Sequence, residues 1–210
     1  MSLRLLPFRQ YNEQDVINMF AIESGLECSD TNTSAEGDNG VFVKVTAGDL
    51  TKDTIEYTAD SYLGKTDYPF VGGTMYPKNP LTISGAASGD IPLGVTLLQT
   101  AKNDENGEKL LYNAQKREEL QAILPGQSVP VLTRGVITLT NDAFDGSLGA
   151  GGNVIGSGIK ISNSNVGKIT GVAPTDTASF GTIIGTGSRT SPQGGLTDQF
   201  SGEYMVVKFG

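Results

Sequence analysis

The chain has 210 residues, of which 28 are glycine, and it has no histidine, no tryptophan, one cysteine and a formal net charge of −8. Without histidine it lacks the commonest acid–base group at neutral pH and the commonest metal ligand, so the composition disfavours an enzyme, a cofactor site and a metal site. The 15 lysine and arginine residues are scattered rather than gathered in the basic stripe that nucleic-acid binding requires, so we expect no nucleic-acid partner. The abundance of glycine, threonine, serine and asparagine is typical of turn-rich β structure.

Residues 1–30 are predicted to form an N-terminal arm because they are more apolar than the chain that follows. Pro7 favours an extended start, and Asn12 suits the N-cap of a short helix near 13–21. A segment this apolar packs either on its own domain or on a neighbouring chain, and the residues leave both alternatives open. The side chains that we expect to anchor the arm on a partner are Leu5, Leu6, Phe8, Tyr11, Ile17 and Phe20.

A polar run at 29–40 predicts a linker, so the expected organisation is an arm at 1–30, a linker at 31–40 and a β-rich domain at 41–210. The lone Cys28 is expected to be an inert small residue. The alternation of apolar residues predicts strands at 41–46 and 54–59. Residues 60–90 are predicted to form an irregular loop with one short strand near 81–84.

Residues 90–210 carry the clearest pattern. Asn106-Gly107 predicts a tight turn, and 113–124 has helical preferences, although an extended form stays open. The strongest strand candidate is 129–140, in which Gly135 predicts a bulge or bend. In the terminal strand Met205 and Val207 are expected to face the core. The remaining expected elements are a strand at 91–100, a turn at 125–126, a glycine-rich loop at 145–158, strands at 159–162 and 166–173, and a long loop at 174–202.

Together these elements predict a mainly β fold, a small β-barrel or sandwich with an extended N-terminal arm, one or two short helices at most, and long glycine-rich loops. The glycine-rich loop matches neither common phosphate-binding motif. The longest apolar stretch falls well short of the roughly 20 residues that span a bilayer, and the first residues lack the apolar core of a signal peptide. We therefore expect a protein made in the cytoplasm with no membrane partner.

Two blocks resemble known virion proteins. The stretches LRLLPFRQYNEQDVINMFA and LGVTLLQTAKNDENGEKLLYNAQKREELQAILPGQSVPVLTRGVITL resemble structural proteins of marine and cyanobacterial tailed phages. The order of VPVLTRGVITL, a glycine-rich loop, VGKITGVA and a closing YMVVKF is similar to that of small β-barrel capsid decoration (cement) proteins. The residues that match this pattern are Gly126, Val129, Val131, Gly135, Gly167, Gly171, Gly202, Tyr204, Val206 and Lys208.

This resemblance implies a protein on the outer surface of a phage head, where it binds the major capsid protein and stabilises contacts between capsid subunits. It also implies a homo-oligomer, with a trimer favoured, and no catalytic residues. The alternative is a tail, baseplate or head-fibre component that binds a host receptor or glycan. An enzyme that uses paired carboxylates is a third, less favoured possibility, because no spacing in the sequence selects such a pair.

Overall fold

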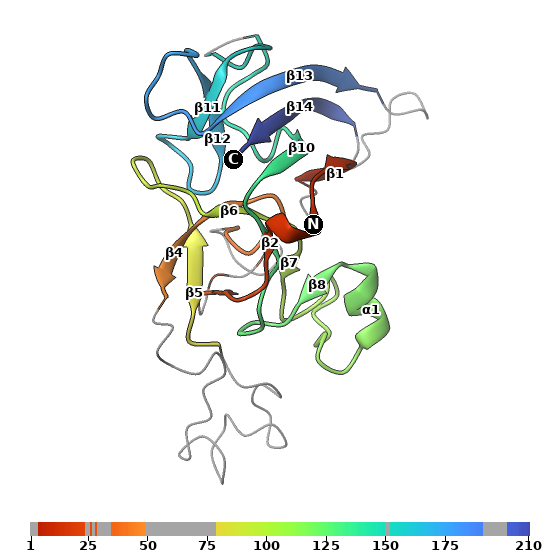
Figure 1. Ribbon diagram of the computed structural model, residues 1–210. Coiled ribbons are helices and arrows are strands. Elements are labelled where there is room, and N and C mark those ends of the chain that lie inside the picture. Colours follow the sequence, from red (N-terminus) through yellow and green to blue (C-terminus); the bar gives the residue numbers. More distant parts are fainter. Residues whose placement is uncertain are drawn as a thin grey trace.

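Two six-stranded β-sheets form a sandwich-like body (Figure 1), so the predicted mainly β fold class is confirmed as a sandwich. The computed structural model describes residues 4–23, 26, 28, 35–48, 79–149, 152–190 and 201–210. Within them there is no closed barrel, and α1 (Ala114–Glu119) is the one α-helix. The predicted strand at 54–59 lies outside the described residues.

The first sheet, sheet A, is antiparallel throughout. Its central strand comes from the end of the sequence, and the predicted core positions Met205 and Val207 are both fully buried, so this prediction is confirmed. In spatial order the strands are β1 (Leu5–Gln10), β10 (Gly135–Thr140), β14 (Gly202–Phe209), β13 (Gly181–Arg189), β11 (Gly158–Ile161) and β12 (Ile169–Val172).

The second sheet, sheet B, is made of shorter strands and is closely curved. Its two outermost strands, β2 and β3, are separated by only three residues of chain. Six strands laid flat would span about 24 Å, which is more than those residues can bridge, so the sheet must curl. In spatial order the strands are β2 (Val16–Ile17), β9 (Val131–Leu132), β6 (Gly94–Thr96), β4 (Phe42–Ala47), β5 (Thr82–Gly85) and β3 (Ala21–Ile22).

The main hydrophobic core lies between the two sheets. Phe42 of sheet B contacts Phe209 of sheet A edge to face, with ring centroids 5.6 Å apart, and it also packs against Phe180. A second core cluster lies inside the curl of sheet B. A small third cluster, made of Cys28, Ala101, Leu110 and Leu124, supports α1 and the short parallel pair β7 (Gln99–Thr100) and β8 (Ala122–Ile123). We call this part of the fold, residues 99–124, the α1 lobe.

The predicted strand 129–140 is two strands, because the chain leaves sheet B after β9 and enters sheet A at β10. Gly135 makes this bend with φ +152°, and a Cβ at this position would lie 2.7 Å from the Cβ of Tyr11. The predicted bend is therefore confirmed, and its physical reason is a change of sheet. The N-terminal chain crosses beside it: the Thr133 amide and hydroxyl donate to the Asp15 carbonyl at 2.9 and 2.8 Å.

The N-terminal segment is part of the body and not a free arm. Strand β1 pairs with β10, β2 with β9, and β3 with β5, so both sheets include it. The helix expected at 13–21 is one 3₁₀ turn, η1 (Glu13–Asp15), which Asn12 caps by accepting a hydrogen bond from the Gln14 amide at 3.3 Å. The β-branched pair that follows enters sheet B instead of continuing the helix.

The described part of the predicted linker is also built into the fold. Residues 37–40 are buried, and Asp38 forms an ion pair of 3.1 Å with Arg4, whose side chain is 7% exposed. The prediction of a separate linker is therefore wrong for residues 35–40. The polar side chains within residues 37–40 can be buried because charged and amide groups of the protein pair with them.

Several local predictions can be compared directly with the structure. The strand near 81–84 is β5, the strands at 159–162 and 166–173 are β11 and β12, and the turn at Asn106-Gly107 is present with Gly107 at φ +83°. The expected loop over 174–202 is wrong at its centre, where β13 forms nine residues of strand. The expected strand at 91–100 is two short strands, β6 and β7, in different sheets.

Candidate interaction surface

Of the six predicted anchor residues, four belong to the protein's own core. Leu5 and Leu6 are 1% and 3% exposed, Phe20 is 8% exposed, and Ile17 packs against the core cluster inside sheet B. These four side chains are unavailable to a partner in this fold, so the prediction that they anchor an arm is wrong. The reason is that this segment forms edge strands of both sheets: β1 in sheet A, and β2 and β3 in sheet B.

Phe8 and Tyr11 remain at the surface, with 62% and 38% of their area exposed. Phe8 belongs to β1, the edge strand of sheet A, and Tyr11 directly follows this strand. The pairing of β1 with β10 is irregular between Leu5 and Arg9, and Pro7 within this stretch has no N–H to give to a ladder. This irregularity leaves Phe8 outside the core, and the Arg9 side chain closes the strand by donating from Nε to the Leu6 carbonyl at 3.0 Å.

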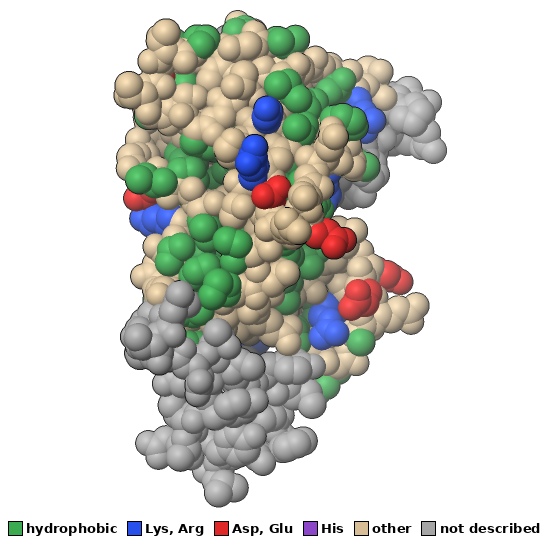
Figure 2. Space-filling view, in the orientation of Figure 1, with side chains coloured by type: hydrophobic (Ala, Val, Ile, Leu, Met, Phe, Trp, Pro, Cys, Tyr) green, Lys and Arg blue, Asp and Glu red, His purple; other side chains and the backbone are tan. Residues whose placement is uncertain are grey.

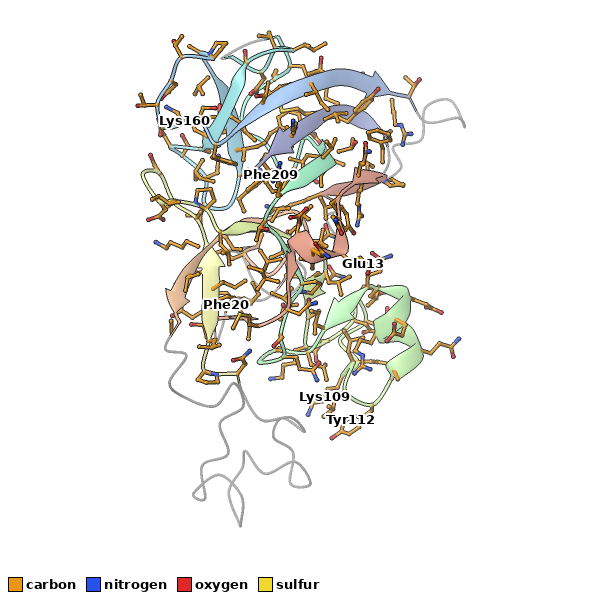
Figure 3. The ribbon with its side chains drawn as sticks, viewed as in Figure 1. Glu13, Phe20, Lys109, Tyr112, Lys160 and Phe209 are labelled. Carbon is orange, nitrogen blue, oxygen red and sulfur yellow. The ribbon has the colours of Figure 1, made fainter. Side chains whose placement is uncertain are left out.

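Tyr11 stands between two shallow hollows. One lies toward the α1 lobe, where Gln121 faces Pro7 and Arg9. The other follows the crossing between the sheets, and it is lined by Gln10, Tyr11, Asn12, Glu13, Asp15, Arg134, Gly135, Val136 and Lys208. The surface is notched between the upper body and the α1 lobe (Figure 2), and Glu13 lies beside this notch (Figure 3).

The hollow at the crossing has charges of opposite sign on its two sides. Glu13 and Asp15 come from η1, whereas Arg134 directly precedes β10 and Lys208 lies near the end of β14. Among the described residues no ion pair joins these two sides. Glu13, Arg134 and Lys208 are exposed, so their charges can meet a partner, and the exposed aromatic rings beside them offer apolar contact.

Other exposed apolar side chains were not singled out in the sequence. Ile91, Tyr112 and Ile155 are 90%, 72% and 65% exposed, and Val154, Ile184, Val45 and Val166 are between 43% and 46% exposed. Tyr112 and Lys109 lie at the far end of the α1 lobe, well away from β1 (Figure 3). For Ile184, a signal was present in the sequence: the apolar run inside the glycine-rich stretch 174–202.

Among the described ionisable groups, Asp145 shows how the loops of sheet A are held. Its carboxylate accepts a hydrogen bond of 2.6 Å from the Ser162 hydroxyl, and this bond lowers the pKa of Asp145 below its ordinary value. Hydrogen bonds from lysine likewise lower the pKa values of Asp90 and Glu105, through Lys44 and Lys116. These contacts join neighbouring segments of the chain and have a structural role.

The described residues contain no group of three histidine, cysteine, aspartate or glutamate side chains placed to hold a metal ion. Cys28 is buried in the small core of the α1 lobe, as an inert small residue would be. In the described part of the chain, no helix has the length and hydropathy needed to span a bilayer.

Comparisons with family models, with curated proteins and with solved structures found no match for this chain.

Proposed function

We propose that this protein is a bacteriophage capsid decoration protein, which binds the outer surface of the head and stabilises contacts between major capsid proteins. The observation that carries the proposal is the pair of aromatic side chains exposed at the β1 edge, Phe8 in the strand and Tyr11 directly after it, beside a hollow with charges of both signs. The similarity of the glycine and valine pattern to cement proteins supports the same assignment.

The geometry suits docking on a protein surface. Aromatic side chains are the commonest anchors of protein interfaces, and burying Phe8 on a partner is worth about 1.5–3 kcal/mol. Oppositely charged groups on the two sides of the hollow fix the orientation of a partner more than they add affinity. On a capsid each weak contact is repeated many times, so modest single-site affinity gives full coverage of the shell.

The body behind this edge is suited to bear load. Strand β1 pairs with β10 at Leu5, Arg9 and Gln10, on either side of Phe8, and the chain connects β1 to β2 and β9 to β10, so this edge is joined to both sheets. A partner that binds this edge therefore contacts a strand that is held by both sheets, which limits the entropy lost on binding.

The test is binding of the purified protein to undecorated capsids, measured by co-sedimentation. Phe8→Ala with Tyr11→Ala is expected to weaken binding by about 10- to 100-fold per exposed ring that is lost. Tyr112→Ala is the matched control, since it removes an exposed aromatic ring from the α1 lobe, and it should bind as the wild type does. Equal affinity of all three proteins would refute docking through β1.

A second measurement tests the role rather than the site. Because the protein would bind assembled shells more tightly than free subunits, shells without it should break at lower temperature or milder osmotic shock, and added protein should restore them. Shells of equal resistance, together with altered adsorption of virions to the host, would favour the receptor-binding alternative.

A further inference from the structure

The hollow between β1 and the α1 lobe contains a backbone conformation that glycine normally provides. Gln121 lines this hollow and has φ +49°, and it and Ala35 are the two non-glycine residues with positive φ in the described part of the chain. Gln121 directly follows Leu120, the C-cap of α1, a position at which glycine is the usual residue with positive φ. A side chain in this left-handed conformation costs stability, so glycine would suit the fold better here.

The backbone on both sides holds Gln121 in this conformation. Its amide donates to the Glu118 carbonyl at 3.0 Å, and its carbonyl accepts from the Gln99 amide at 3.3 Å, so the chain turns from α1 directly into β8. The Gln121 side chain is exposed and has no hydrogen-bond partner among the described residues. The fold therefore gains no such bond from a side chain that costs it stability, and residues strained in this way cluster at functional sites.

Arg9, on the β1 side of the same hollow, has no carboxylate partner among the described residues. Its Nε donates to the Leu6 carbonyl at 3.0 Å, which holds the guanidinium against its own strand and leaves both Nη groups for another acceptor. Of the described residues that line this hollow, Arg9 is the one that carries a charge, and Glu13 and Asp15 line the neighbouring hollow instead. The hollow is therefore locally positive on a chain with a net charge of −8.

We infer that Arg9 and Gln121 together bind a carboxylate, an aspartate or glutamate side chain that the capsid protein presents to this hollow. The two Nη groups of an arginine match the two oxygens of a carboxylate, and the Gln121 amide group adds a donor from the α1 lobe. This partner is the one that the proposed function assigns to the β1 edge, so the inference rests on that function.

Both donors are held in place before a partner binds. Arg9 is held by the bond from its Nε to β1, and Gln121 is held by the turn between α1 and β8. Groups that are ordered in advance lose little conformational freedom on binding, so the affinity gained offsets the stability that Gln121 costs. The net negative charge of the chain repels an acidic group elsewhere, so attraction confined to this hollow also sets the orientation of the partner.

The first experiment compares stability with binding in Gln121→Gly. Loss of the side chain relieves the strain, so Tm should rise by about 2–4 °C, while affinity for undecorated capsids, measured by co-sedimentation, should fall by about 3- to 10-fold. Ala35→Gly is the matched control, because it relieves a φ of +55° at a residue that lines neither hollow, and it should bind as the wild type does. A lower Tm in Gln121→Gly would show that the side chain serves the fold, and unchanged affinity would show that it does not contact the partner. Either result overturns the inference.

The second experiment tests the charge of the partner. Gln121→Glu and Arg9→Gln should each lower affinity for undecorated capsids by about 10-fold or more, whereas Gln121→Lys, which keeps a donor and adds a positive charge, should bind at least as tightly as the wild type. Gln115→Glu is the matched control, since it makes the same change at an exposed position of α1 outside the hollow, and it should leave the affinity unchanged. Equal affinity of Gln121→Glu and Gln121→Lys, or wild-type affinity of Arg9→Gln, would overturn the assignment of an acidic partner.

The variant with Phe8→Ala and Tyr11→Ala separates this inference from the proposed function. If that variant loses affinity while every Gln121 variant binds as the wild type does, the inference is wrong and docking at β1 stands. If the wild type itself does not bind undecorated capsids, both are wrong. Circular dichroism of each variant verifies that the fold is intact.

Discussion

The orientation of β14 can be tested with a pair of adjacent substitutions. Val207 is fully buried between Ile137 of β10 and Ile183 of β13, whereas Val206 faces the other side of sheet A and is only half-buried. In Val207→Asp the protein loses about 1.5–3 kcal/mol of apolar burial and gains an unpaired carboxylate in the core, which costs several kcal/mol more. The sum is about 4 kcal/mol or more, a large part of the 5–15 kcal/mol that stabilises a typical domain.

The assay is thermal unfolding followed by circular dichroism. For a chain of this size each 1 kcal/mol lowers Tm by about 2–4 °C, so Val207→Asp should lower it by about 8–16 °C or leave the chain unfolded. Val206→Asp is the matched control and should lower it by only a few degrees. The destabilisation of Val207→Asp should also shrink at acidic pH, because the buried carboxyl is easier to hold when it is protonated. A larger loss of Tm in Val206→Asp than in Val207→Asp would refute the placement of this strand.

Three further predictions concern single sites, each measured as the free energy of unfolding in denaturant. Gly135→Ala should lower the free energy of unfolding by about 1–3 kcal/mol, because at φ +152° the added Cβ would press against Tyr11. This loss should exceed that of Gly107→Ala, where no described atom lies within 4 Å of the added Cβ. Asp38→Asn should cost about 3–5 kcal/mol, since it leaves the buried arginine of the pair without a counter-charge, and a loss below 1 kcal/mol would contradict the ion pair. Ser162→Ala should cost about 1 kcal/mol at neutral pH. In the wild type, the hydrogen bond from Ser162 lowers the pKa of Asp145 below its ordinary value of 3.8. The stability that this bond contributes is therefore present above pH 3.8 and is lost as the pH falls through the lower pKa of the folded state. If the stability lost in Ser162→Ala stays constant down to about pH 2, this linkage is refuted.

Alternation of side chains along strands could be predicted from the sequence. The closing strand has β-branched and apolar residues at every second position, and its buried face was identified because this pattern depends only on local geometry. The turn at Asn106-Gly107 was identified for the same reason, since a glycine at positive φ is a local requirement.

The pairing of distant segments could not be predicted in the same way. Residues 129–140 have the pattern of one strand, and only the contact of Asp15 with Thr133, 118 positions apart, shows that the chain changes sheet there. The N-terminal residues are apolar enough for an arm or a core strand, and the choice depends on which sheet edges are vacant. Sequence composition carries no information on that point.

The candidate surface was predicted in part. Phe8 and Tyr11 were chosen for being apolar, but the backbone irregularity around Pro7 decides that Phe8 faces solvent while Leu5 faces the core. The apolar run that holds Ile183 and Ile184 was visible in the sequence, but which of the two side chains faces the core depends on the pairing of β13 with β14, which is a long-range contact.

The position of β14 has a consequence for synthesis of the protein. This strand follows all the others of sheet A in sequence, yet it lies between β10 and β13. While the chain emerges from the ribosome, the edges of β10 and β13 that later pair with β14 therefore remain exposed, and sheet A is completed only after β14 has left the exit tunnel. A chain released before that point has two unpaired strand edges, to which other nascent chains can bind. Premature termination should accordingly yield aggregates rather than a smaller folded product, and the cell's chaperones would recognise these chains by their open strands.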